Sequence, residues 1–317
     1  MDSKRNLGQY YTLGNPFGHP AFTAWAAKAG LPQATVLEPF AGANFLIDML
    51  REQGMCQSFL SYDLAPNHPD VAQRDTLADF PHGHSVVVTN PPYLARNSAK
   101  RRGLAFPETT YDDLYKHALA ITLAHVPWVA AIVPDSLFTA GVFLDRAQAF
   151  VSLPQSMFSD TEHPVCLALF GPADVSGDPE LWAGERLLGR LADIQRALPN
   201  PTHAHPWVFN DPHGTVGLLA VDSQEGPTIR FIDGTTIPST DIKHSSRAIT
   251  RIGAPFLAPA QIPTLLAVAN ATLARMRADT GDALMTSFKG LRKDGRYRRR
   301  LDFAAARRIL DTAMERL

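Results

Sequence analysis

Four consecutive residues, Asn90-Pro91-Pro92-Tyr93, combine the groups needed to hold a planar amino group. The amide oxygen of Asn90 and the backbone carbonyl of Pro91 are two hydrogen-bond acceptors, and the ring of Tyr93 is a flat stacking surface. Both prolines fix φ and lack an N–H, so the backbone that carries the acceptors is rigid. An exocyclic NH2 group on a nucleobase has two matching donors and a flat ring. The tetrad therefore predicts a site for such an amine; the alternative is a Pro-rich turn with a packed tyrosine.

The tetrad needs a strand to position it, and the preceding residues supply one. Residues 85–89 are mostly β-branched and predict a buried strand, which the two prolines end. A second candidate lies at 38–44, Glu-Pro-Phe-Ala-Gly-Ala-Asn, between a predicted strand at 35–38 and a predicted helix at 45–53. Its glycine and alanines allow a ligand to approach the backbone closely.

Acidic residues follow the first strands of the predicted sheet. Glu38 ends the first strand, Asp63 follows the strand at 58–62, and Asp75 lies in the loop that leads to 85–89. A carboxylate at the end of the second strand commonly binds ribose hydroxyls in dinucleotide folds. This edge would therefore suit an adenosine cofactor with a cationic centre. The alternative is that Glu38 and Asp63 only cap helices or end strands.

Strands and helices alternate through the first half of the chain, which predicts an α/β fold. The expected sheet is Rossmann-like, twisted and mostly parallel, with helices on both faces and ligands at the carboxyl ends of its strands. The remaining elements expected in this half are helices at 16–30 and 112–125 and strands at 129–133 and 164–170.

Turn-forming residues at 171–179 predict a boundary between two domains, residues 1–175 and 176–317. The second, smaller domain has mixed α+β character. We expect a hairpin in the basic segment, with Asp294-Gly295 at its turn. The other expected elements are helices at 180–197, 259–278 and 302–316 and a hairpin formed by 217–222 and 228–233.

Composition is that of an ordinary globular protein: 317 residues, 45% hydrophobic and 19% charged. No apolar run is long enough to span a bilayer and no signal core follows Met1, so we expect a cytoplasmic protein with no membrane partner. Cys56 and Cys166 predict buried thiols rather than a disulfide framework. The histidine pairs 82/84 and 203/205 are interpreted as loop residues, and no metal is expected.

Charge is unevenly distributed, although the net charge is only −1. Residues 289–317 hold ten Lys/Arg and four Asp/Glu, a net of +6, which leaves −7 for residues 1–288. Such segments favour nucleic-acid phosphates, and their alternative is a solvated surface. The predicted DNA-contacting residues are Arg96, Lys100, Arg101, Arg102, Lys289, Arg292, Lys293, Arg296, Arg298, Arg299 and Arg300.

These motifs, in this order, resemble those of the gamma class of amino-methyltransferases, which methylate adenine in DNA. The resemblance covers roughly residues 4–171. Residues 7–12, Leu-Gly-Gln-Tyr-Tyr-Thr, are similar to the family's N-terminal motif, 38–42 to its cofactor turn, and 90–93 to its catalytic motif. Asp63 resembles the ribose-binding acid, and Asp75 the residue that meets the adenine of the cofactor.

The resemblance implies S-adenosylmethionine as cofactor and direct methyl transfer to a base rotated out of the duplex. Its implied catalytic residues are Asn90, Pro91, Pro92 and Tyr93, with a second stacking aromatic that is either Phe158 or His163. The implied cofactor residues are Tyr10, Thr12, Glu38, Pro39, Phe40, Ala41, Gly42, Asp63, Asp75 and Asn90.

The implied partners are double-stranded DNA and a separately encoded restriction endonuclease, unless the enzyme is solitary or phage-borne. A bacterial or phage-infected cytoplasm and a monomer or weak dimer are expected. Three alternatives stay open: methylation of RNA, methylation of protein glutamine, and a catalytically silent DNA-binding relative. The target sequence cannot be inferred.

Overall fold

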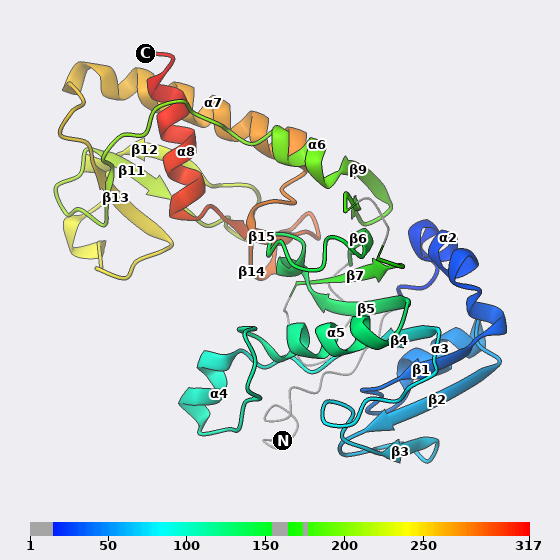
Figure 1. Cartoon of the computed structure of the whole chain (residues 1–317). Helices are drawn as coiled ribbons and strands as arrows, with labels where there is room; N and C mark the ends of the chain where they lie inside the picture. Colours follow the sequence, from blue (N-terminus) through cyan, green and yellow to red (C-terminus); the bar gives the residue numbers. More distant parts are fainter. Residues whose placement is uncertain (1–14, 154–163, 174–176) are drawn as a thin grey trace. The chain divides into compact units, whose positions relative to one another are not determined.

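The computed structural model describes residues 15–153, 164–173 and 177–317 (Figure 1). The chain divides into two compact units, Met1–Leu187 and Leu188–Leu317. Several predicted residues lie outside the described parts: the N-terminal motif at 7–12 with the predicted cofactor residues Tyr10 and Thr12, and both candidates for the second aromatic, Phe158 and His163.

The first unit is built on a sheet with strand order β3-β2-β1-β4-β5-β7-β6-β8-β9. Neighbours from β3 to β5 run parallel, whereas β7 is antiparallel to β5 and to β6. This order is Rossmann-like, and it confirms the predicted fold class. The strands are β1 (Thr35–Glu38), β2 (Ser58–Asp63), β3 (Val71–Gln73), β4 (Val86–Thr89), β5 (Trp128–Pro134), β6 (Ala147–Ser152), β7 (Val165–Phe170), β8 (Glu180–Ala183) and β9 (Arg186–Arg190).

The order of the strands creates a topological switch point between β1 and β4, where the sheet begins to grow in the opposite direction. From β1 the chain continues to β2 and β3 on one side, and β4 and β5 then extend the sheet on the other side. In open α/β sheets, ligands bind outside the carboxyl ends of the strands at such a point. The turns after Glu38 and Thr89 both lie there.

The helices of the first unit include α2 (Pro20–Ala29), α3 (Phe45–Glu52), α4 (Arg96–Arg102) and α5 (Leu114–His125), of which α2, α3 and α5 pack on the sheet. Helix α2 begins with a proline, is capped by the His19 side chain and ends at Gly30, whose φ of 63° suits a residue without Cβ. Apolar side chains of α2 and α3, including Trp25 and Ile47, pack against Val88 and other residues on one face of the sheet. Because every residue of β4 and β7 is buried, both faces are covered, as expected for a mostly parallel sheet.

The predicted helix at 180–197 is wrong for most of its length. Residues 180–183 form β8, which pairs in parallel with β6, and only α6 (Leu191–Arg196) is helical. Gly184, with φ 55°, follows β8 and takes a conformation that favours glycine. Pairing with a strand distant in sequence overrides the local helix propensity here. Strands β3 and β6 were not predicted either.

The second unit combines a four-stranded antiparallel sheet, order β10-β13-β11-β12, with the β14-β15 hairpin. Both predicted hairpins are confirmed, although β13 also pairs with the far side of β11. Helices α7 and α8 pack on each other, and their apolar side chains share one core with the four-stranded sheet. The elements are β10 (Val208–Phe209), β11 (Val216–Leu219), β12 (Arg230–Asp233), β13 (Ile249–Gly253), α7 (Ile262–Thr280), β14 (Thr286–Leu291), β15 (Tyr297–Arg300) and α8 (Phe303–Met314).

Candidate active site at the ends of β1 and β4

A hydrogen bond between side chains joins the ends of the two neighbouring strands β1 and β4. Thr89 Oγ1 donates to Glu38 Oε1 over 2.7 Å, and the backbone N–H of Phe40 donates to the same oxygen over 2.9 Å. Since Asn90 follows Thr89 and Pro39 follows Glu38, the tetrad and the predicted cofactor turn begin next to each other. The structure therefore brings the two strongest motifs of the sequence to one place.

Glu38 is buried, with 1% of its surface exposed. Its Oε2 atom has no hydrogen-bond partner among the described residues. Burial raises the pKa of Glu38 to about 8, an effect that the bonds from Thr89 and Phe40 partly oppose and the charge of Asp63 reinforces. The carboxyl group is therefore mostly protonated at neutral pH, and its second oxygen is a buried polar atom that a ligand could satisfy.

Asp63 holds the turn after β1 in place. Its Oδ2 accepts from Gly42 N over 2.8 Å, and its Oδ1 accepts from Ala65 N over 2.8 Å. Ala41 N also donates to the backbone carbonyl of Tyr62 over 2.8 Å. Asp63 thus links the turns that follow β1 and β2. Its predicted contact with a ribose stays a prediction.

Sequence reasoning gave no role to two residues of this site, although the first of them is the last residue of the candidate turn at 38–44. Asn44, the N-cap residue of α3, is 1% exposed with φ 62°; its Oδ1 accepts from Ser61 Oγ over 2.7 Å, and its Nδ2 has no partner among the described residues. Thr76 is 3% exposed and donates to the Pro39 carbonyl over 2.7 Å. An asparagine just before a predicted helix is a signal that could have identified Asn44, because this residue tolerates the left-handed region.

Asp75, the predicted contact for the cofactor's adenine, is exposed. Its Oδ1 accepts from the backbone N–H groups of Leu77 and Ala78, at 3.1 and 3.2 Å. This local turn is a common role of aspartate. Its neighbour Thr76 makes the connection to the predicted cofactor turn.

Within the tetrad, Tyr93 is fixed at its hydroxyl end. Tyr93 Oη lies 2.6 Å from Asn90 Oδ1 and 2.7 Å from the backbone oxygen of Ile132 in β5. The ring also meets Tyr115 edge to face, with centroids 6.1 Å apart. Asn90 Oδ1 is the acceptor predicted for the amine, and an amide oxygen has two lone pairs, so the tyrosine uses one of them.

The basic cluster after the tetrad contains two kinds of residue. Arg96 donates to the backbone oxygens of Thr109 and Tyr111 and lies over the Phe106 ring, so it supports the following loop. Three other members of the cluster are exposed near the C-terminal end of α4: Lys100, Arg101 and Arg102.

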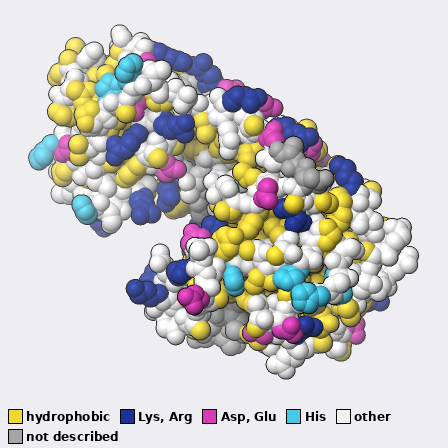
Figure 2. All heavy atoms as spheres, viewed as in Figure 1, with side chains coloured by type: hydrophobic (Ala, Val, Ile, Leu, Met, Phe, Trp, Pro, Cys, Tyr) yellow, Lys and Arg dark blue, Asp and Glu magenta, His cyan; other side chains and the backbone are white. Residues whose placement is uncertain are grey.

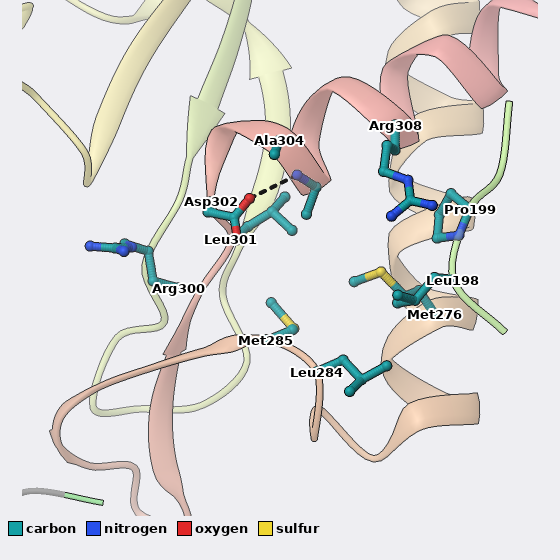
Figure 3. A pocket seen from close by; sticks show the side chains of 11 residues that line it. Leu198, Pro199, Met276, Leu284, Met285, Arg300, Leu301, Asp302, Ala304 and Arg308 are labelled. Carbon is teal, nitrogen blue, oxygen red and sulfur yellow. Dashed lines mark hydrogen bonds between the residues drawn. The ribbon is translucent and has the colours of Figure 1, made fainter. Parts of the chain in front are cut away.

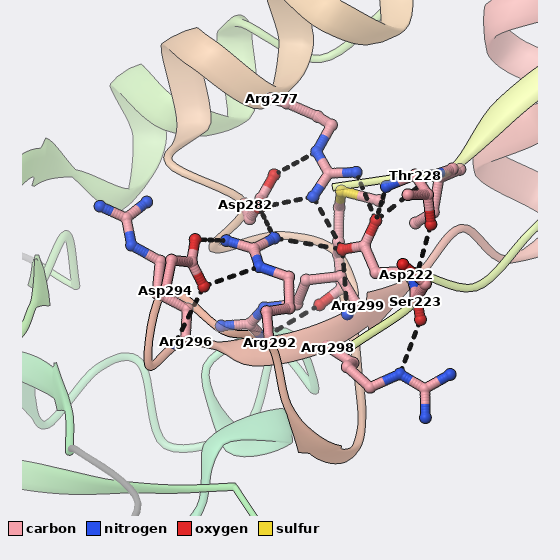
Figure 4. A network of polar contacts seen from close by, with 12 residues as sticks. Asp222, Ser223, Thr228, Arg277, Asp282, Arg292, Asp294, Arg296, Arg298 and Arg299 are labelled. Carbon is pink, nitrogen blue, oxygen red and sulfur yellow. Dashed lines mark hydrogen bonds and ion pairs between the residues drawn. The ribbon is translucent and has the colours of Figure 1, made fainter. Parts of the chain in front are cut away.

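The basic segment of the second unit is divided between interior and surface. Figure 4 shows Arg292 among the carboxylates of Asp222, Asp282 and Asp294. Arg292 and Arg299 are only 4% and 9% exposed. Arg292 contacts the carboxylates of Asp222, Asp282 and Asp294, and the bond to Asp294 raises its pKa although burial lowers it. These two arginines therefore belong to the interior of the unit rather than to a DNA-contacting surface.

The other basic residues of the hairpin are accessible. Lys289, Lys293 and Arg296 are exposed, and Lys293 forms an exposed ion pair with Glu225. Arg298 and Arg300 are half-buried, and Arg298 donates to the Asp222 backbone oxygen over 2.6 Å. On the face shown in Figure 2, Lys and Arg side chains occur at several separate places.

A cavity of about 180 Å³ lies within the second unit (Figure 3). Its walls are mainly apolar and include Met276, Met285 and Leu301. Arg308 points toward Pro199 beside the cavity, whereas the Arg300 guanidinium turns away from it (Figure 3). The cavity holds no predicted catalytic residue.

Cys56 and Cys166 are buried and free, as predicted. Among the described residues, no group of three or more His, Cys, Asp or Glu side chains could hold a metal ion. His205 Nδ1 lies 3.0 Å from Asp311 Oδ1, which supports a structural role. Within the same residues, no helix has the length and apolar character to cross a membrane.

Comparison with known proteins finds no matching family model. It also finds no match among curated proteins. Among solved structures, the chain is similar to a Listeria monocytogenes protein described as a class I S-adenosylmethionine-dependent methyltransferase, with 15% identity, TM-score 0.38, and coverage of 52% of this chain and 64% of that one.

Two further similar structures are methyltransferase subunits of type I restriction–modification systems. The Streptococcus thermophilus subunit is 15% identical over 54% of this chain and 47% of its own, with TM-score 0.38. The EcoKI M protein is 13% identical over 80% of this chain and 68% of its own, with TM-score 0.35. The chain thus spans about half to two thirds of the length of these proteins.

Proposed function

We propose that this protein transfers a methyl group from S-adenosylmethionine to the exocyclic amine of adenine in DNA. One observation carries the proposal: the Thr89–Glu38 hydrogen bond joins the ends of β1 and β4, and therefore the starts of the predicted cofactor turn and the predicted amine-binding tetrad, at the switch point of the sheet. A methyl donor in the turn and an amine at the tetrad would be neighbours.

The residues of the turn fit an S-adenosylmethionine molecule. Glu38 Oε2 and Asn44 Nδ2 are buried polar atoms without partners among the described residues, and a polar ligand would satisfy them. Gly42, with φ 52°, lets the backbone approach the ligand closely. The cofactor would supply the activated methyl group.

The residues of the tetrad would position the acceptor. Asn90 Oδ1 and the Pro91 carbonyl accept the two amine hydrogens, which turns the nitrogen lone pair toward the methyl group. The Tyr93 ring replaces part of the stacking lost when the base leaves the duplex, worth about 1–3 kcal/mol. Proximity and orientation account for much of the expected rate, because no covalent intermediate is needed.

Radiolabelled S-adenosylmethionine and plasmid DNA test the proposal directly. We expect the label in N6-methyladenine after nucleoside analysis. Replacement of Asn90 by alanine should lower the rate on the order of 10²–10³-fold, because one preorganised polar contact to the reacting group is lost. Asn200→Ala, at an exposed asparagine, is the matched control and should react like the wild type.

Other outcomes would redirect the assignment. Label in RNA or in protein, with none in DNA, would favour the corresponding methyltransferase. DNA binding without any methyl transfer would favour a silent relative. Equal rates for Asn90→Ala and the wild type would contradict the role given to the tetrad.

A further inference from the structure

The hydroxyl of Tyr93 lies between two oxygen acceptors on different elements. Asn90 Oδ1 is 2.6 Å away within the tetrad, and the Ile132 backbone oxygen is 2.7 Å away in β5. A phenol has a single O–H proton, so the two contacts share it. Tyr93 therefore connects the side chain of the predicted amine acceptor to the backbone of the sheet.

The position of Ile132 explains how this contact arises. Strand β4 ends at Thr89, which is paired with Ala131 of β5. Strand β5 continues to Pro134, so Ile132 lies one residue beyond the last β4 pairing. The chain leaves β4 through the two prolines and brings Tyr93 back to this oxygen.

The hydrogen bond from Tyr93 restricts the orientation of the Asn90 side chain. The terminal torsion of asparagine is broad, so its rotamer preference does not fix the amide plane. Pro91 and Pro92 fix the backbone but not this torsion. A hydrogen bond to a hydroxyl that is itself bonded to the sheet restricts it.

We propose that the Tyr93 hydroxyl is a positioning group, which holds the Asn90 amide plane in the orientation that accepts the amine. This inference rests on the proposed function and gives Tyr93 a role besides stacking. The ring faces the base, whereas the hydroxyl acts through Asn90.

Tyr93→Phe separates the two roles, because it keeps the ring and removes the hydroxyl. We expect the single-turnover rate constant with saturating DNA and S-adenosylmethionine to fall about 10- to 100-fold, as for the loss of a partly buried hydrogen bond that orients a reacting group. The affinities for both ligands should stay within about twofold. A loss of affinity with an unchanged rate constant would overturn the proposal.

Tyr115→Phe is the matched control. The Tyr115 hydroxyl is also buried and hydrogen-bonds to Ser136, and its ring contacts Tyr93. The variant loses a comparable bond next to the site without touching Asn90, so its rate constant should equal that of the wild type. An equal fall in both variants would show a general loosening of the site and would overturn the proposal.

A second measurement does not depend on the reaction. In protein labelled with ¹⁵N at asparagine side chains, the Asn90 NH2 resonances, assigned through Asn90→Ala, should be rigid in the wild type and mobile in Tyr93→Phe. Unchanged Asn90 dynamics would overturn the positioning role. Absence of methyl transfer by the wild type would instead refute the proposed function, so the two failures are distinguishable.

Discussion

The tetrad and the basic hairpin are both conspicuous in the sequence, but the fold keeps the residues of the tetrad together and separates those of the hairpin. Asn90 and Tyr93 stay together at one strand end, because a turn with two prolines carries its geometry locally. Successive residues of β15 instead alternate between buried and half-buried positions, so Arg299 lies inside while Arg298 and Arg300 lie nearer the surface. The residues of a short turn motif therefore stay together in the fold, whereas a strand places successive basic residues on its two opposite faces.

Asp222 explains why arginines occupy the interior of the second unit. This fully buried residue receives two bonds of 2.9 Å from Arg277 and one of 3.2 Å from Arg292. Burial raises the pKa of Asp222, but the bonds and charges of the arginines outweigh it and leave the pKa below its usual value. Buried charges are tolerated when each has such partners.

Removal of Asp222 should have the largest effect on stability. Asp222→Ala leaves Arg277 and Arg292 with only Asp282 and Asp294 as carboxylate partners and removes the acceptor of buried backbone N–H groups, including that of Arg299. The free energy of unfolding should therefore fall by about 3–5 kcal/mol. Chemical denaturation measures it, and hydrogen exchange of β11 and β15 assigns the transition to the second unit.

Glu225→Ala is the control for this prediction. It removes the exposed ion pair with Lys293 from the same turn region, and the change should be within about 0.5 kcal/mol. If Asp222→Ala and Glu225→Ala lowered the free energy of unfolding by similar amounts, buried and exposed ion pairs would contribute equally to stability, which would contradict the prediction.

The buried carboxyl group beside the tetrad gives a pH-dependent effect. The pKa of Glu38 is about 8 in the folded chain and 4.5 ordinarily, so the folded state binds more protons between these values. Its stability should therefore fall as pH rises through this range. Glu38→Gln, which stays neutral, should be about 2–4 kcal/mol more stable than the wild type above the folded pKa, and equally stable below the ordinary value.

Denaturation of both proteins across this pH range measures the difference. Parallel stability curves for the variant and the wild type would contradict a buried, protonated Glu38. In that case the environment of the Glu38 carboxyl group would be closer to that of the solvent-accessible hairpin residues than to that of the buried Asp222.

The smallest effect concerns the outward basic residues of the hairpin. Replacing Lys289 and Arg296 by alanine should weaken DNA binding about tenfold and reduce the salt dependence by about two counterions, with unchanged thermal stability. Fluorescence anisotropy at several salt concentrations measures both quantities.

Arg299→Met is the inward counterpart. It should lower thermal stability, because Arg299 is buried and contacts Ser287 and the Met285 carbonyl. Below its unfolding transition, DNA affinity should match the wild type. If Arg299→Met lost more DNA affinity than the variant with Lys289 and Arg296 replaced by alanine, the inward arginine and not the outward residues would contact DNA, which would contradict the prediction. Replacing all three arginines from 298 to 300 would mix the two effects.

Much of the first unit is determined by local sequence. Buried apolar strands such as 86–89, each ending at a turn of characteristic composition, predict an α/β sheet with polar residues at its carboxyl edge. The prolines after Asn90 and the glycine in the turn after Glu38 act through backbone conformation, so their effects do not depend on distant residues. The turns that follow β1 and β4 could therefore be predicted, and their roles toward a cofactor and an amine stay predictions.

Tertiary structure alone decided which polar groups meet. Besides any local contacts, Glu38, Asn44 and Tyr93 each form a hydrogen bond with a residue of a different strand, namely Thr89, Ser61 and Ile132. No local sequence pattern predicts these three bonds. The pairing of residues 180–183 with β6 and the burial of Arg292 also depend on segments far away in the chain. Strand pairing and burial are long-range effects, so the sequence determined which types of side chain follow each strand, and the fold decided which of these side chains meet.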